Sequence, residues 1–122
     1  IMITLRITDQ NTGLELATAA CAADTLLSRL RGLLGTKSLP AGQGLLITPC
    51  NSVHMIGMKY AIDVVFLDKE FTVLKIVSCL QPYSFAGCWQ AVAALELPAG
   101  TIATTKTQVG HRLQVVKYSS RE

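Results

Sequence analysis

Three side chains with soft donor atoms, Cys50, His54 and Met58, follow one another at intervals of four residues. On a helix this spacing would place a thiolate, an imidazole and a thioether on one face, where they could bind Cu(I) or another soft metal. A strand rises about 3.3 Å per residue, so its consecutive donors would lie ~13 Å apart, too far to share an ion. The β-branched residues and the glycine between the donors favour a strand or a loop. We therefore expect His54 to be hydrogen-bonded and Met58 to pack in the core, with a soft-metal or thiol site as the alternative.

Cys50 and His54 also permit a second chemistry. With Asp63 they would supply a nucleophile, a base and an orienting carboxylate. However, these residue types are common, and no local sequence resembles the activating turn of a cysteine hydrolase. Cysteine-dependent hydrolysis is therefore the third hypothesis, and no catalytic residue is assigned. The sequence has no Cys-x-x-Cys or His-x-x-x-His pair, so a zinc site has little support.

Two carboxylates lie within apolar runs. Asp63 falls in Ala-Ile-Asp-Val-Val-Phe-Leu and Glu96 in Ala-Leu-Glu-Leu. Burying a carboxylate is costly unless it is paired or hydrogen-bonded, so each must find partners or reach water. Each is expected to be a structural acceptor for backbone N–H groups or for Arg29 or Arg31, and the alternative is a polar anchor at a ligand pocket. The candidate ligand-binding residues are His54, Met58, Asp63, Glu96 and Arg29.

The elements that must position these residues follow from hydrophobic periodicity. Alternating or β-branched runs predict strands. The predicted strands cover residues 3–7, 14–20, 45–48, 53–58, 62–67, 71–79, 91–97 and 112–118. Leucines at helical spacing predict a helix over 24–35, with Asp24 as its N-cap and Gly35 at its end. A short second helix is compatible with residues 98–107, and residues 81–90 are expected to be an irregular connection.

These elements predict an α+β fold that is mostly β. The economical architecture is a small curled antiparallel barrel or sandwich with one or two short helices, the leucine-rich helix covering an open end or face. A single domain over residues 1–122 is expected, because this length suits one domain and 50% of the residues are hydrophobic. Only 16% are charged, so some apolar surface is expected to be exposed.

The net charge, the apolar runs and the cysteine spacing indicate which partners and which cellular compartment to expect. The net charge of +3 is spread without runs, so the basic footprint of a nucleic-acid binder is missing and no such partner is expected. No apolar run approaches the roughly 20 residues that a membrane span needs. The four cysteines are too widely spaced to be a disulfide framework, so reduced thiols are expected. We expect a cytoplasmic location, and a periplasmic one if the chain is processed.

Several stretches together resemble an uncharacterised bacterial and archaeal family known as domain of unknown function 192. They are residues 29–34, 44–47, 52–68, 95–100 and Gly110, in order over about 24–116, and the most specific block is 54–68. Many members have a Trp just before the Met that corresponds to Met58 and an Asn-Thr pair after it, where this chain has Gly57, Tyr60 and Ala61. The resemblance implies a compact, mostly β fold with a helix ahead of the Gly-Leu-Leu segment, and it implies no reaction.

The leading functional hypothesis is a non-enzymatic β-rich domain that binds a small ligand or a partner protein near His54, Met58, Asp63 and Glu96. No cofactor is expected. The alternatives are the soft-metal or thiol site at Cys50, His54 and Met58, and then cysteine-dependent hydrolysis.

Overall fold

The computed structural model describes residues 2–23 and 38–120 of the chain, and these residues form mostly β structure. The elements are β1 (Met2–Asp9), β2 (Glu15–Ala23), β3 (Gln43–Ile47), β4 (Ser52–His54), β5 (Ile62–Leu67), β6 (Val73–Leu80), β7 (Phe85–Gly87), β8 (Ala93–Pro98), α2 (Thr101–Thr105) and β9 (Leu113–Ser120). The helix expected over 24–35, together with Arg29 and Arg31, lies outside the described residues.

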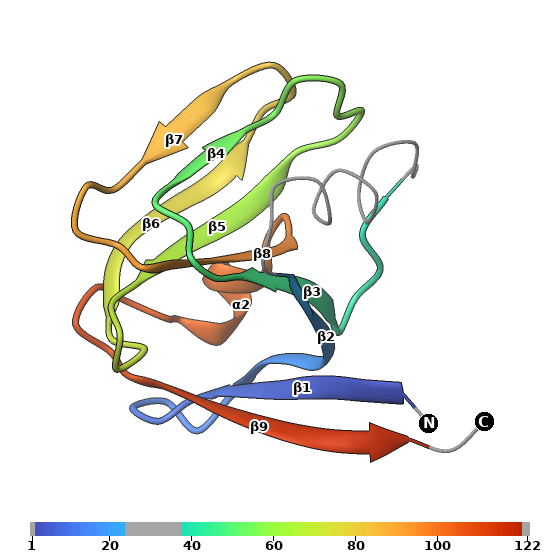
Figure 1. The fold of residues 1–122 in the computed structure, drawn as a ribbon, viewed down its shortest axis with the longest axis vertical. Helices are drawn as coiled ribbons and strands as arrows, with labels where there is room; N and C mark the ends of the chain where they lie inside the picture. Colours follow the sequence, from blue (N-terminus) through green and yellow to red (C-terminus); the bar gives the residue numbers. More distant parts are fainter. Residues whose placement is uncertain (1, 24–37, 121–122) are drawn as a thin grey trace.

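Seven strands form one curled sheet in the order β6-β5-β8-β3-β2-β1-β9 (Figure 1). Its pairs are antiparallel except β2 with β3, which run parallel. The expected antiparallel sheet is therefore mixed, because the long connection after Ala23 allows a crossover instead of a tight hairpin. The curl brings the two edges together at one end, where Thr72 bridges Arg112, but the sheet does not close into a barrel.

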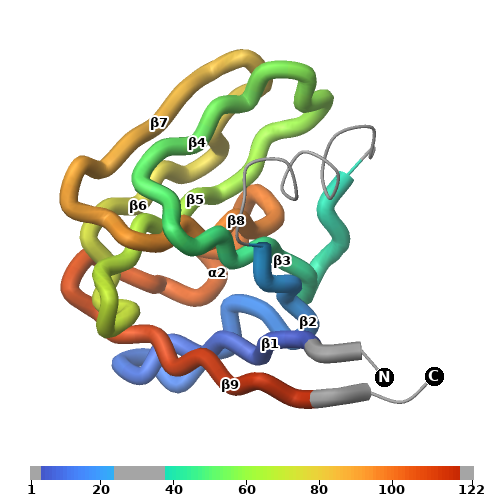
Figure 2. Tube along the Cα trace, in the orientation of Figure 1, coloured from blue at the N-terminus to red at the C-terminus, as the bar shows by residue number. Residues whose placement is uncertain are grey.

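The central strands of this sheet are buried on both faces. Along β5, Val65 and Leu67 pack on one face, while Val64 and Phe66 pack on the other. The first face, which we call the α2 side, contacts β1, β2, β9 and α2. The second face, the β4–β7 side, is covered by the two-stranded sheet of β4 and β7. Figure 2 shows β1 and β9 side by side at one end of the molecule and β4 and β7 at the other.

Most predicted strands are confirmed within a few residues, and the two main differences both concern the small sheet. β4 spans only Ser52–His54 instead of 53–58, because the chain turns at Met55 and Gly57 has φ +82°. β7 lies inside the segment 81–90 that was expected to be irregular, because Pro82 and Gly87 are not typical of a strand. Its three residues become a strand through pairing with β4, a contact between segments far apart in the sequence. The short helix is confirmed as α2.

Candidate functional site

Asp63 is a buried structural acceptor. It lies on the α2 side of β5 and is 1% exposed. Its Oδ1 accepts the N–H of Cys79 at 2.9 Å, and its Oδ2 accepts the N–H groups of Gly100 at 3.1 Å and Ile102 at 2.9 Å. The carboxylate thus joins the irregular end of β6 to the first turn of α2. Both oxygens are engaged by backbone donors, which favours the structural interpretation over a pocket anchor.

Glu96 faces the opposite side of the sheet. Val64 pairs with Glu96 across β5 and β8, whereas Asp63 pairs with Leu97. Because side chains alternate along a strand and directly opposed residues share a face, Glu96 lies on the β4–β7 side, where Val64 packs. Glu96 is completely buried. The two carboxylates therefore cannot line one pocket.

The three soft donors occupy different environments. Met58 is 3% exposed and packs in the core on the β4–β7 side, as expected. His54 is exposed on the outer face of β4, and its ring lies 4.9 Å from that of Phe85. Cys50 is half-buried before β4, and its Sγ donates to the carbonyl of Ser52 at 3.1 Å. Within residues 2–23 and 38–120, no group of three or more His, Cys, Asp or Glu side chains could hold a metal ion.

The hydrolase constellation is likewise not assembled. Asp63 faces the α2 side, and its oxygens accept backbone N–H groups instead of orienting an imidazole. His54 points outward from the small sheet, because its neighbour Val53 points into the core. A base and its orienting carboxylate must be within hydrogen-bond reach of each other, and here a packed sheet separates them.

Large apolar side chains are exposed on and around β7 instead. Phe85 is 60% exposed and Trp89 is 88% exposed. We call Phe85, Trp89 and the His54 ring that contacts Phe85 the aromatic face. Tyr83 and Ile56 are also largely exposed, in the loops that flank the small sheet. Exposed aromatic clusters of this kind often mark interaction sites, because leaving them in water is unfavourable.

A hollow of about 550 Å³ lies beside the aromatic face, and we call it the β7 hollow. Its lining residues are Asn51, Ser52, Lys75, Phe85, Ala86, Gly87, Cys88 and Trp89. Lys75 comes from β6, and its Nζ donates to the carbonyl of Gly87 at 2.8 Å. Known ligand pockets have volumes of ~300–1,000 Å³, so the β7 hollow is of suitable size.

The two chain segments that line the β7 hollow carry no acidic residue. The sequence has no Asp or Glu between Asp24 and Asp63 or between Glu70 and Glu96. Lys75 is the charged residue in the lining of the β7 hollow. An anionic group would therefore meet one ammonium and no like charge here.

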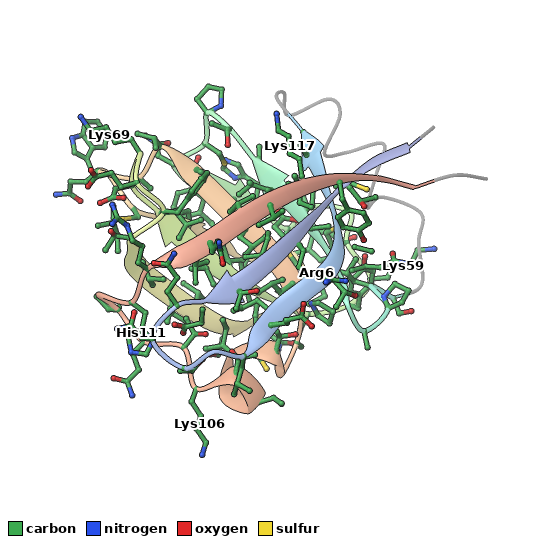
Figure 3. The ribbon with its side chains drawn as sticks, turned by 90° about the horizontal axis from the view of Figure 1, so that it is seen from below. Arg6, Lys59, Lys69, Lys106, His111 and Lys117 are labelled. Carbon is green, nitrogen blue, oxygen red and sulfur yellow. The ribbon has the colours of Figure 1, made fainter. Side chains whose placement is uncertain are left out.

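A pair of titratable side chains, Asp9 and His111, lies away from the β7 hollow. His111 is near the turn between β1 and β2 (Figure 3). His111 Nδ1 lies 2.8 Å from Asp9 Oδ2, and the Asp9 residue is fully buried. Burial acts to raise the pKa of Asp9, but hydrogen bonds from His111, Thr107 and the N–H groups of Asn11 and Thr12 outweigh it and hold that pKa below its ordinary value. The partners are so far apart in the sequence that no local motif indicates the pair.

Neither the β7 hollow nor its lining was predicted as the site. Of the predicted ligand-binding residues, His54 lies on the aromatic face, and Met58, Asp63 and Glu96 are in the interior. The sequence did carry one indication of the β7 hollow. Residues 81–90 combine aromatic residues with Pro and Gly and contain no charged residue, which is typical of a functional loop. Lys75 had no such signal, because it lies within a strand.

The fold and this surface define a small, mostly β domain with a curled mixed sheet, a covering two-stranded sheet and an exposed aromatic face. The chain belongs to the DUF192 family, whose model is described as an uncharacterised ACR and matches residues 6–115. The match begins within β1 and includes all of β2, so on the N-terminal side it extends further than the 24–116 inferred from the motifs. No curated protein matches significantly.

Two solved structures share the fold. One is a protein of unknown function from Novosphingobium aromaticivorans, with a TM-score of 0.76 and 19% identity over 91% of this chain and 83% of that one. The other, from Sinorhizobium meliloti, is named as a candidate transcription regulator and has a TM-score of 0.79 and 20% identity over 93% of this chain and 94% of that one. Among the described helices, none is long and apolar enough to cross a membrane.

Proposed function

We propose that this protein is a non-enzymatic binding module and that the β7 hollow, with the aromatic face, is its binding site. The observation that carries the proposal is the exposure of Phe85 and Trp89 beside a hollow of about 550 Å³. Aromatic rings provide a large apolar contact area at low entropic cost, and such rings are enriched where proteins bind ligands and partners. The polar groups of Asn51, Ser52 and Lys75 in the same lining would orient an occupant.

This proposal moves the site away from the buried residues singled out by sequence. Asp63, Glu96 and Met58 are buried parts of the folded core, and His54 contributes its ring beside Phe85. The name of the Sinorhizobium protein is not extended to this chain, because at 20% identity the likeness concerns the fold alone.

A fragment screen by two-dimensional NMR tests the proposal. A library of small aromatic and anionic fragments is added to the ¹⁵N-labelled protein, and shifted amides are mapped. We expect them to cluster at residues 51–52, 75 and 84–89. Trp89 is the single tryptophan of the chain, so its indole N–H signal and its fluorescence report directly on the β7 hollow.

Paired variants provide the control. Phe85→Ser with Trp89→Ser should remove fragment binding, whereas Val109→Ser, which alters an apolar residue of similar exposure outside the lining of the β7 hollow, should not. Fragments that shift amides elsewhere, or that bind the double variant as well as the parent, would contradict the proposed site.

A further inference from the structure

We propose that the occupant of the β7 hollow is an extended peptide segment of a partner protein, which adds to the outer edge of β7 as a third strand of the small sheet. The inference rests on the proposed function and names the class of its ligand. The proposed segment has apolar residues at alternate positions and at least one carboxylate. Its basis is the orientation of the β7 backbone, the position of Lys75 and the charge of the lining.

The backbone of β7 has an edge that faces away from β4. Cys88 donates its N–H to the carbonyl of Asn51 at 2.9 Å, which makes this a hydrogen-bonded position of the antiparallel ladder. Residues along such a strand alternate between facing the partner strand and facing outward. The N–H and C=O groups of Phe85 and Gly87 therefore point away from β4. In the described part of the chain, β7 pairs with β4 and with no other strand.

The hollow adjoins that edge and also extends to the β4 side of β7, where Asn51 and Ser52 line it. Lys75 lines it at the outward edge, where its Nζ meets the carbonyl of Gly87. A chain lying in the part beside Lys75 would be within reach of the outward backbone groups of β7. Two-stranded sheets are marginally stable alone, and a third strand adds both hydrogen bonds and side-chain contacts. Peptide recognition by strand addition uses this principle, with backbone hydrogen bonds providing affinity and alternate side chains providing specificity.

Lys75 occupies the edge in the absence of a partner. Its ammonium donates to the carbonyl of Gly87, and the side chain is solvent-exposed, so it can move at little cost. A lysine on a strand edge also discourages indiscriminate pairing between edges. An incoming N–H would replace Lys75 on Gly87, and the released ammonium would then pair with a carboxylate of the added strand.

The lining selects the side chains of the segment. Apolar residues at alternate positions would pack on Phe85 and Trp89, which are already exposed. A carboxylate would face Lys75 without repulsion, since the chain has no acidic residue between Glu70 and Glu96. Proline at an edge-facing position would be excluded, because it lacks the N–H that the strand must donate.

The test begins with random eight-residue peptides displayed on phage and selected against the intact protein. We expect enriched sequences with an acidic residue, alternating apolar residues and no proline in the central positions. A synthetic copy of the leading peptide is then titrated while Trp89 fluorescence is followed. Single N-methyl groups, introduced at each peptide position in turn, should weaken binding about tenfold or more at every second residue and little at the others, because only alternate amides face β7.

Charge reversal provides a second readout. Lys75→Glu should weaken the binding of the acidic peptide at least about tenfold. The same variant should restore binding to a copy of the peptide in which the acidic residue is replaced by lysine. Lys59→Glu, at an exposed lysine outside the lining of the β7 hollow, is the matched control and should leave both affinities unchanged. Amide spectra of both variants show whether each is folded.

The outcomes separate this inference from the proposed function. Peptides that bind in the β7 hollow without an alternating N-methyl pattern would overturn strand addition and leave the binding site standing. Selection of no peptide, together with fragments that bind at residues 84–89, would overturn the peptide inference alone. If neither fragments nor peptides bind there, both proposals fail.

Discussion

Replacing Asp63 by asparagine tests the energetic role of the buried carboxylate. Its two oxygens accept three backbone N–H groups, from Cys79, Gly100 and Ile102. Asparagine keeps the shape of the side chain but supplies one acceptor oxygen and one NH₂ donor. The best orientation keeps the oxygen on the two amides of α2 and turns the NH₂ toward the N–H of Cys79. Two donors then face each other in a buried site.

The cost follows from these contacts. A buried N–H left without an acceptor costs about 1–3 kcal/mol, and the remaining bonds to Gly100 and Ile102 lose their charge-assisted strength. We therefore expect Asp63→Asn to lower the free energy of unfolding by about 2–4 kcal/mol. Urea denaturation followed by far-UV circular dichroism measures this change, and the m-value should stay constant because the buried surface does not change.

Asp68→Asn is the matched control. Asp68 lies in the turn before β6, where its Oδ1 alone accepts the N–H groups of Glu70 and Thr72, both at 2.9 Å. An asparagine oxygen can keep both bonds, so the loss should stay below about 1 kcal/mol. A midpoint for Asp63→Asn at or above that of the parent, with an unchanged m-value, would refute the structural role of Asp63 and return it to consideration as a ligand anchor.

Three further predictions concern other parts of the fold. The pKa of Asp9 lies below its ordinary value of 3.8, so the stability that its carboxylate contributes is present above that value and is lost as the pH falls through the folded-state pKa. Asp9→Asn should therefore flatten the decline of the urea midpoint that the parent shows below about pH 4. An unchanged decline would contradict this. Gly44→Ala should lower stability by about 1–3 kcal/mol in the same assay, since the new methyl group would lie 3.0 Å from the carbonyl oxygen of Glu96, whereas Gly87→Ala, with its nearest neighbour at 3.5 Å, should be nearly neutral; equal effects would argue against the close approach. All four cysteines are free thiols, so the melting temperature should be the same with and without reductant, and a drop of several degrees on reduction would reveal an oxidised pair.

Local sequence was sufficient for most of the strands. Alternation along 3–7 and the apolar run of 62–67 identify β1 and β5, because the side-chain period of a strand is expressed within a few residues. The same run indicated that Asp63 must find partners or reach water, since an unpartnered buried carboxylate there would be too costly. Family membership was likewise readable from short motifs in the chain.

The assembly of those elements depended on contacts that no local window contains. Whether Asp63 and Glu96 share a pocket was decided by the register of β5 against β8, which puts them on opposite faces. β7 exists because β4 lies beside it, and the β7 hollow exists because residues of β4, β6 and β7 meet there. The sequence by itself determined which residues alternate and which are buried, because periodicity and hydrophobicity are local properties. Tertiary structure decided which buried and exposed residues meet, because strand pairing and packing act between segments far apart along the chain.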